Sequence, residues 1–276
     1  KCRKMKKKYA IEVVGCPWDA FWNHGLKGKI LAPYEFFYAK KEVKEAKWVL
    51  YVTNRFLQNR YPTNGKSVSC SNVSLNKFDV GVLNRRIDRI NNHSGKIILG
   101  TAAALNVHYK GQEYVIRALS KLKKIGKTNF EYQMIGMGNS HYLEKIAKKY
   151  DVLDEIKIIG QLSHEKVYEW LEQIDIYIQP SLQEGLPRAV IEAMSYGVPC
   201  MGSKIAGIPE LIDETMLFKP KNVKAIVNIL KDIDKIWMEK LALMNYEKAK
   251  EYDVEILKER RYNFYREFAQ SLEEEC

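Results

Sequence analysis

Two glutamates lie eight positions apart, one in a turn and one in the helix after it. Glu184 follows DIYIQP, a run typical of a buried strand, and Glu192 stands in an otherwise apolar stretch with Val190 and Met194. A buried carboxylate needs hydrogen-bond donors, and the vicinal hydroxyls of a ribose are suitable ones. We therefore expect Glu192 to bind a ligand. The alternatives are an ion pair of Glu192 with Arg188, and for Glu184 an ordinary turn acid.

The turn between this strand and helix has the composition of an anion site. Pro187 is expected near the first helical position, where its missing N–H matters little. The backbone amides of Gly185, Leu186 and Arg188 then have no carbonyl partner inside the helix. These amides and the helix dipole attract phosphate oxygens.

The elements that position this turn form a regular series between about residues 96 and 233. Short β-branched runs alternate there with amphipathic helices, as in a doubly wound parallel sheet. The expected strands are KIILG, FEYQMIG, EIKIIG, DIYIQP and VPCMG, and the expected helices cover 112–125, 142–149, a segment from Ser163, and 189–196. The predicted fold class is therefore α/β with a complete Rossmann-like unit at residues 91–235.

A smaller part precedes this unit and a helical tail follows it. Strands are expected at 10–14 and 48–52, helices at 38–46 and 53–60, and a polar linker at 79–96, which makes residues 1–90 a partial Rossmann-like domain. Residues 236–276 are predicted to be helices that pack back toward the N-terminal part. The residues that support this fall on one stripe of a helix: Val254, Leu257, Arg261, Phe264, Phe268 and Leu272.

The composition indicates a class of binding partner but does not identify one partner. Forty-five Lys and Arg against thirty-four Asp and Glu give a net charge of +11, which favours anionic partners. The longest apolar runs fall far short of the roughly 20 residues that a membrane-spanning helix needs. Five scattered cysteines and isolated histidines predict neither a disulfide framework nor a metal site, and the basic stretch ALSKLKKIGK lacks the interleaved aromatics of a nucleic-acid surface.

Several motifs together resemble the C-terminal donor domain of retaining GT-B glycosyltransferases, the large group 1 (GT4-like) class. These are the Glu184 to Glu192 spacing, the following EAMSYGVP and AGIPELI, and the pair Lys110-Gly111 that opens the first helix. Gly136 and Gly138 are similar to the glycine loop of that family, and Gln161 with Leu162 to its base-packing segment. The resemblance is strong over residues 96–230 and weak over 10–79. The glycine loop is not a dinucleotide-binding fingerprint, because His141 stands at the third glycine position.

The resemblance implies roles for these residues. Glu192 would bind ribose hydroxyls, Glu184 hydroxyls of the donor sugar, and Lys110 with the turn amides the diphosphate. A lysine and fixed amides at the departing diphosphate stabilise charge that develops as the glycosidic bond breaks, so neither a metal nor another cofactor is expected. Asp232-Ile233-Asp234, a DxD triplet, is assigned to the solvated face of a helix.

The chain departs from the family pattern in two places. Ala104 stands where many members carry an arginine, so Arg188 or Lys204 is expected to supply the second positive charge. No strand with a glycine-rich loop precedes Tyr9, which implies that the first part of the N-terminal domain is missing. In CPWDAFWNHG, Trp18, Asp19 and His24 are candidate acceptor-side residues, with core aromatics as the alternative.

The function expected from the sequence is a hexosyltransferase of the EC 2.4 class in surface polysaccharide biosynthesis. It would move a sugar with retention from a nucleoside diphosphate sugar, a UDP-sugar rather than a GDP-sugar, to a carbohydrate or lipid-linked acceptor. The expected location is the cytoplasm, at the inner face of the membrane, with contact to anionic lipid and none to nucleic acid. A non-catalytic nucleotide-sugar-binding module that needs a partner chain is the alternative.

Overall fold

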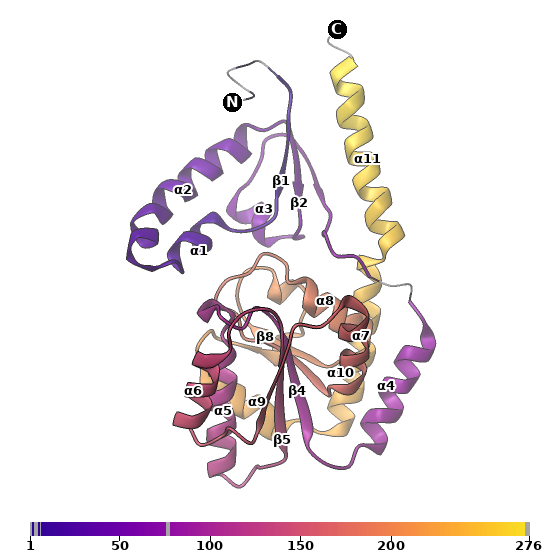
Figure 1. The fold of residues 1–276 in the computed structure, drawn as a ribbon. Coiled ribbons are helices and arrows are strands. Elements are labelled where there is room, and N and C mark those ends of the chain that lie inside the picture. The colour runs from indigo at the N-terminus through magenta and orange to yellow at the C-terminus, as the bar shows by residue number, and fades with distance from the viewer. Residues whose placement is uncertain (1, 3–4, 6, 76–77, 274–276) are drawn as a thin grey trace.

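The protein consists of two α/β parts stacked one above the other, with the last helix running up beside the N-terminal part (Figure 1). The structure is a computed structural model that describes residues 2, 5, 7–75 and 78–273. Within these residues no helix is both long enough and apolar enough to cross a membrane.

The N-terminal part is a small parallel sheet flanked by helices. Its strands, in the spatial order β1-β2-β3, are β1 (Ala10–Val13), β2 (Trp48–Tyr51) and β3 (Lys66–Ser69). Its helices are α1 (Pro17–Trp22), α2 (Gly25–Glu45) and α3 (Phe56–Arg60). Val49 and Leu50 at the centre of β2 are fully buried, so this short sheet has a core of its own.

Helix α2 is much longer than the segment 38–46 expected from the sequence. It begins at Gly25 and includes Gly28 and Pro33, two residue types that are unfavourable inside a helix. Gly28 has a packing role, because a Cβ there would lie 2.1 Å from the carbonyl oxygen of Phe21 in α1. The glycine therefore allows α1 and α2 to pack closely.

The C-terminal part is a six-stranded parallel sheet. Its strands are β4 (Ile97–Ala102), β5 (Phe130–Ile135), β6 (Ile156–Gly160), β7 (Ile176–Gln179), β8 (Cys200–Ser203) and β9 (Leu217–Phe218). The helices of this part are α5 (Gln112–Lys124), α6 (His141–Lys149), α7 (His164–Gln173), α8 (Arg188–Ser195) and α9 (Val223–Asp232), with 3-10 turns at His108–Lys110, Ile208–Glu210 and Glu214–Met216. Two parallel sheets with covering helices confirm the predicted α/β class.

The strand order places a ligand crevice within this sheet. The order is β6-β5-β4-β7-β8-β9, so the chain builds outward in one direction from β4 and in the other from β7. Ligands of such sheets bind at the carboxyl ends of the strands where the order reverses. Here those ends are Ala102 of β4 and Gln179 of β7.

The linker expected at 79–96 is instead mostly helix α4 (Val80–Asn92), packed on the C-terminal part. Asp79 caps its start by accepting a hydrogen bond from the Gly81 amide. The Arg86 side chain is buried and donates to the carbonyl oxygens of Leu171, of Ile174 at 2.5 Å and of Tyr196 at 3.3 Å. Since these carbonyls end α7 and α8, α4 belongs structurally with the C-terminal part, which therefore begins near residue 80 rather than 91.

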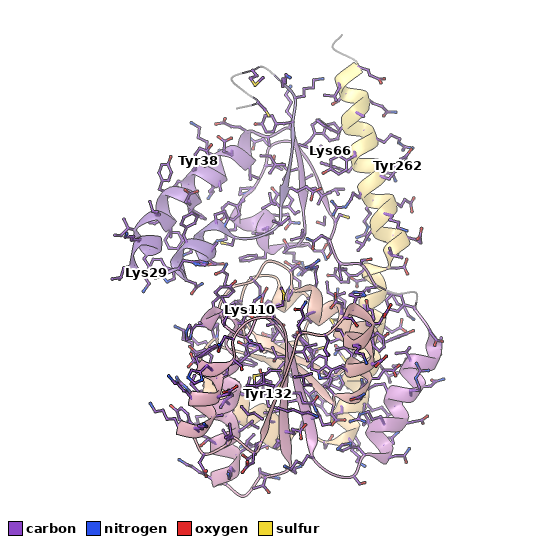
Figure 2. The ribbon with its side chains drawn as sticks, viewed as in Figure 1. Lys29, Tyr38, Lys66, Lys110, Tyr132 and Tyr262 are labelled. Atoms are coloured by element: carbon purple, nitrogen blue, oxygen red, sulfur yellow. The ribbon has the colours of Figure 1, made fainter. Side chains whose placement is uncertain are left out.

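The tail forms α10 (Lys235–Ala249), a 3-10 turn (Lys250–Tyr252) and α11 (Val254–Glu273). Phe264 and Phe268 of α11 meet the Trp48 ring edge-on, with centroids 5.7 and 5.9 Å apart. Lys66 of β3 pairs with Glu267, while Tyr262 points away from the sheet (Figure 2). Helix α11 therefore packs along the N-terminal sheet.

The DxD triplet is exposed, but it does not lie within one helix as predicted. Asp232 is the last residue of α9, and Asp234 caps α10 by accepting a hydrogen bond from the Trp237 amide at 2.7 Å. The Asp234 carboxylate thus serves the start of a helix.

Arg86 offers a test of this packing. Replacement of Arg86 by Ala removes charge-assisted hydrogen bonds and leaves buried carbonyls without donors, so we expect a loss of about 3 kcal/mol in the free energy of unfolding. The matched control is Arg85→Ala, whose ion pair with Glu172 is exposed and screened by solvent, so its loss should change the free energy of unfolding far less. Urea denaturation measures both values, and equal losses would contradict the account.

Candidate functional site

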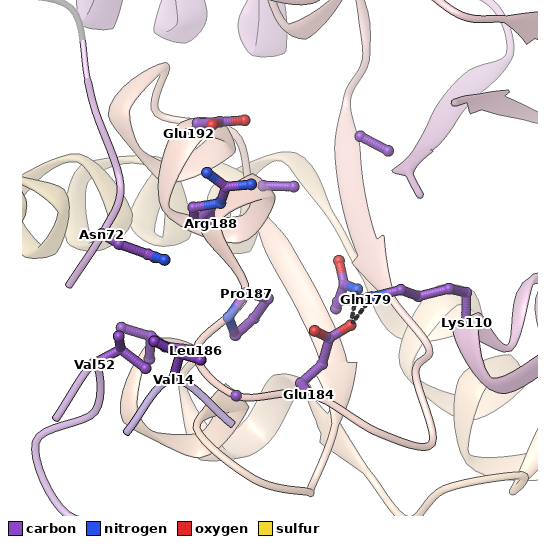
Figure 3. Close-up of a pocket in the computed structure, with 13 residues that line it drawn as sticks. Val14, Val52, Asn72, Lys110, Gln179, Glu184, Leu186, Pro187, Arg188 and Glu192 are labelled. Atoms are coloured by element: carbon purple, nitrogen blue, oxygen red, sulfur yellow. Dashed lines mark hydrogen bonds and ion pairs between the residues drawn. The ribbon is translucent and has the colours of Figure 1, made fainter. Parts of the chain in front are cut away.

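A pocket of about 480 Å³ lies between the two parts of the chain. Figure 3 shows Val14, Val52 and Asn72 of the N-terminal part on one side, and the turn after β7 on the other. From the C-terminal part it is lined by Ala102, Lys110, Gln179, Glu184, Gly185, Leu186, Pro187, Arg188, Ala189 and Glu192. Both Ala102 and Gln179 are strand ends at the reversal of strand order, and the volume suits a small-molecule site.

Glu184 is the centre of a hydrogen-bond network in this pocket. Its Oε1 accepts from Lys110 Nζ at 2.7 Å, from Ser181 Oγ at 2.7 Å and from Gln179 Nε2 at 2.9 Å. Gln179 and Ser181 are buried, and the side-chain amide oxygen of Gln179, Oε1, in turn accepts from the buried Tyr177 hydroxyl at 2.9 Å. Three donors thus hold one carboxylate oxygen, while the other oxygen accepts no hydrogen bond from the residues described here.

Lys110 reaches Glu184 because of the glycine that follows it. Gly111 begins α5 with φ of 76°, and a Cβ at this position would lie 2.0 Å from the carbonyl oxygen of Pro180. The Leu182 amide also donates to the carbonyl of Tyr109 at 2.7 Å. The segment that carries Lys110 is therefore packed directly against the turn that carries Glu184.

The start of α8 presents free backbone donors to the pocket. In the described part of the chain, the N–H groups of Gly185, Leu186 and Arg188 donate to no protein acceptor. Pro187 has φ of −73° and ψ of 109° and precedes the first helical residue, one position earlier than expected. The Arg188 side chain is exposed and lines the pocket, so amides and a cation converge here.

Glu192 lies one turn further along α8, on the pocket wall. Its carboxylate makes no hydrogen bond or ion pair with the residues that the structure describes, including the Arg188 pair that was the alternative. Burial raises the pKa of the Glu192 carboxyl, and the charges of His164 and Arg188 lower it only in part. A half-buried acid without a protein partner has room for the hydroxyls of a ligand.

The two parts of the chain meet at this same turn. A Cβ on Gly185 would lie 2.3 Å from the carbonyl oxygen of Val14, at the end of β1. The Gly207 amide donates to the carbonyl of Gly185 at 2.9 Å. Glu210 accepts hydrogen bonds from the amides of residues 54, 55 and 56 at 2.6, 3.1 and 2.7 Å. The AGIPELI segment therefore joins the turn to the N-terminal part.

Four residues predicted to bind the donor do not line this pocket. Gly136 and Gly138 have φ of 147° and 105° and hold the loop after β5 against the loop after β4, where a Cβ would meet the carbonyl of Ala103 or the side chain of Asn106. Gln161 is exposed and Leu162 half-buried after β6. All four follow neighbouring strands at the same end of the sheet, and their roles stay predictions.

The candidate acceptor residues separate into two groups. Trp18 is half-buried, stacks on the exposed Trp22 with ring centroids 5.3 Å apart and packs against Phe36. The Asp19 carboxylate lies 3.8 Å from the Arg60 guanidinium. Neither lines the pocket. His24 faces the Tyr109 ring across the two parts, with centroids 6.0 Å apart, so it lies at the edge of the cleft.

The structure distinguishes the two candidates for the second positive charge. Arg188 lines the pocket, whereas Lys204 pairs with Glu214 at 2.7 Å on an exposed surface. Arg188 is therefore the candidate that the geometry supports in place of an arginine at Ala104.

Sequence reasoning missed the polar residues that hold Glu184. Gln179 and Ser181 flank Pro180, and a glutamine that ends an otherwise apolar strand is a signal for the carboxyl edge of a sheet. Asn72 and Val52 enter the pocket from the N-terminal part, which no local sequence pattern indicates.

Comparison with solved structures defines the fold class. Sucrose-phosphate synthase from Thermosynechococcus elongatus aligns with a TM-score of 0.78 at 15% identity, over 96% of this chain and 69% of that one. Anabaena Alr3699/HepE, solved with UDP and glucose, aligns with a TM-score of 0.69 at 15% identity, over 99% and 73%. The fold is that of GT-B glycosyltransferases.

The chain belongs to the family described as Glycosyl transferases group 1, which matches residues 84–251. Protein CapJ of Staphylococcus aureus is 36% identical over 261 residues, which are 92% of this chain and 64% of CapJ. The amylovoran biosynthesis glycosyltransferase AmsK of Erwinia amylovora is 37% identical over 114 residues, 39% of this chain and 28% of AmsK. The chain thus spans less than two thirds of the length of these relatives.

Gly111 tests the close approach that positions Lys110. Its φ of 76° nearly equals the 77° of Gly126, where a Cβ would meet open space. Alanine at Gly126 should therefore lower the free energy of unfolding by only about 1 to 2 kcal/mol, from the left-handed backbone alone.

Alanine at Gly111 adds a Cβ placed 2.0 Å from the Pro180 carbonyl oxygen. We therefore expect the free energy of unfolding to fall by at least about 2 kcal/mol more than it does for alanine at Gly126. Urea denaturation of both variants measures the difference. Equal losses would show that Gly111 and Pro180 are not packed as described.

Proposed function

We propose that this chain is a glycosyltransferase that moves a sugar from a nucleoside diphosphate sugar, a UDP-sugar, to a carbohydrate or lipid-linked acceptor during surface polysaccharide assembly. The observation that carries the proposal is one pocket in which Lys110, the Glu184 carboxylate, Glu192 and the free backbone N–H groups of Gly185, Leu186 and Arg188 converge. The names of AmsK and of the colanic acid relatives of Salmonella and Escherichia place polysaccharide assembly among the functions of related chains.

The donor would lie along α8. Glu192, with no protein partner in the described chain, takes the two ribose hydroxyls. The diphosphate meets the amides at the start of α8 and the Arg188 and Lys110 side chains. The unbonded oxygen of Glu184 then accepts hydroxyls of the donor sugar. HepE, whose fold is similar, was solved with UDP-glucose, which supports a uridine nucleotide here.

The chemistry follows from these positions. The bond between the anomeric carbon and the diphosphate oxygen breaks, and its electrons leave with the diphosphate. Lys110 and the amides stabilise that negative charge without reorganisation, so the step needs no metal. The acceptor oxygen bonds to the anomeric carbon on the face that the phosphate leaves, with retention, and its proton passes to the leaving phosphate.

The acceptor would enter from the side of His24 and the N-terminal part. His24 lies opposite Tyr109 at the edge of the cleft, and Val14, Val52 and Asn72 face the donor turn. We propose that the protein works in the cytoplasm at the inner face of the membrane, where nucleotide sugars and lipid-linked acceptors meet.

Glu192 tests donor binding. The variant Glu192→Gln keeps the shape of the side chain but loses one oxygen and the charge. Because a hydrogen bond to a charged group is worth about 1.5 to 3 kcal/mol, UDP affinity should fall at least about tenfold. Glu169→Gln, an exposed change on α7, should leave affinity unchanged. Isothermal titration calorimetry measures all three proteins, and unchanged affinity in Glu192→Gln would reject the role.

The raised pKa of Glu192 predicts a pH dependence of the same binding. Lowering the pH protonates this carboxyl earlier than an ordinary glutamate, so UDP affinity should decrease toward acidic pH. The neighbouring groups His164, Tyr168 and Arg188 are the same in Glu192→Gln. The difference between the two pH profiles therefore isolates Glu192, and parallel profiles would contradict its role.

Turnover is tested separately from binding. The chain is incubated with UDP-sugars and GDP-sugars, with and without lipid-linked and soluble acceptors, and nucleotide release is followed. Release from UDP-sugars, with an anomeric NMR signal of the same configuration in the product, supports the proposal. Donor binding without release under all acceptors would support the binding module instead.

A further inference from the structure

Helix α2 is apolar on two opposite faces, only one of which is covered. Gly28, Ala32 and Val43 are buried against the N-terminal part. The opposite face carries large exposed apolar side chains at helical spacing, here called the α2 ridge: Leu26, Ile30, Leu31, Tyr34, Phe37 and Tyr38, which are 81, 78, 47, 64, 67 and 53% exposed. A contiguous apolar ridge of this kind marks an interaction surface.

The ridge lies on the outer side of the N-terminal part. Tyr38 and Lys29 project outward from α2, on the side away from α11 (Figure 2). Tyr34 and Tyr38 stack on each other with centroids 6.1 Å apart, and Trp22 of α1, 44% exposed, continues the apolar surface. No other described element of the chain covers this face.

Lysines surround the ridge. Helix α2 carries Lys27, Lys29, Lys40, Lys41 and Lys44 against three glutamates, and in the described chain none of these lysines forms an ion pair. Three of them line a shallow pocket of about 410 Å³ at the C-terminal end of the ridge: Phe37, Lys40, Lys41, Lys44, Glu45 and Asn64. Exposed aromatic and aliphatic groups beside unpaired lysines are typical of helices that lie in an anionic lipid interface.

The ridge begins at the edge of the donor cleft. Just before α2, Asn23 donates to the Gln183 side chain at 3.5 Å, and His24 faces Tyr109. Gln183 precedes Glu184 in the donor turn. A surface that holds α2 therefore lies next to the opening through which an acceptor would reach the donor.

We propose that the α2 ridge and its lysines dock this protein on a bilayer of anionic phospholipid. The ridge enters the interfacial region, and the lysines contact lipid phosphates. The purpose of this docking rests on the proposed function, because it brings a lipid-linked acceptor to the cleft. The docking itself does not require that function.

Charge argues for a lipid surface rather than a second copy of this chain. Two copies joined through the ridge would place their unpaired lysines close together, in a protein of net charge +11. An anionic bilayer neutralises those charges and at the same time removes apolar side chains from water.

The test uses sedimentation of the full chain with vesicles. The probes are phosphatidylcholine vesicles and mixed phosphatidylcholine and phosphatidylglycerol vesicles. The ridge variant combines Leu26→Ser, Ile30→Ser and Phe37→Ser. Its matched control combines Ile125→Ser, Ile236→Ser and Tyr262→Ser, which are 58, 81 and 65% exposed just after α5, on α10 and on α11. A charge variant combines Lys40→Gln, Lys41→Gln and Lys44→Gln.

We expect the full chain to bind the anionic vesicles, and this binding should weaken as salt is added. The vesicle affinity should fall at least about tenfold in the ridge and charge variants but not in the control variant. Equal binding by ridge and control variants, or equal binding to neutral and anionic vesicles, overturns the proposal. So does self-association through the ridge without vesicle binding. UDP affinity, measured without vesicles, should be unchanged in the ridge variant, so a failure of donor binding is distinguished from a failure of docking.

Discussion

A carboxylate removed from water must find donors, and the turn after β7 is built around this requirement for Glu184. Its Oε1 accepts three hydrogen bonds, from Lys110, Gln179 and Ser181. Each donor comes from a different position at the carboxyl edge of the sheet, and Gln179 is held in turn by buried Tyr177. The network fixes the turn, and the turn fixes the start of α8. The free amides and Glu192 are therefore presented to the pocket in one arrangement.

The cleft depends equally on how the two parts are joined. Because Gly185 has no side chain, the turn after β7 can contact the end of β1. The Glu210 carboxylate accepts hydrogen bonds from three backbone amides at the start of α3. Helix α11 returns along the N-terminal sheet and packs Phe264 against Trp48. These contacts place Val14 and Asn72 opposite the amides of α8. The pocket is thus a property of both parts together.

Local patterns predicted the C-terminal part well because its strands and helices alternate regularly and glycine or proline separates most of them. The same patterns failed where tertiary packing decides. Helix α2 begins at Gly25 and runs on past Pro33, and close packing on α1 needs the glycine at position 28. The sequence of α4 predicts a linker because it is rich in charged residues. No local pattern shows that one of them, Arg86, is buried and donates to carbonyl oxygens at two helix ends. For the site, spacing indicated Glu184, Glu192 and Lys110, but the contact between Lys110 and Glu184 joins positions 74 residues apart and has no local signal.

We propose that the pocket between the two parts binds a nucleoside diphosphate through Glu192 and the amides at the start of α8. A crystal structure of the chain with UDP tests this binding mode. We expect both ribose hydroxyls to donate to the Glu192 carboxylate, and the diphosphate oxygens to accept from the amides of Gly185, Leu186 and Arg188, with Lys110 alongside. UDP bound elsewhere, or bound here with Glu192 out of hydrogen-bond range of the ribose, would contradict it.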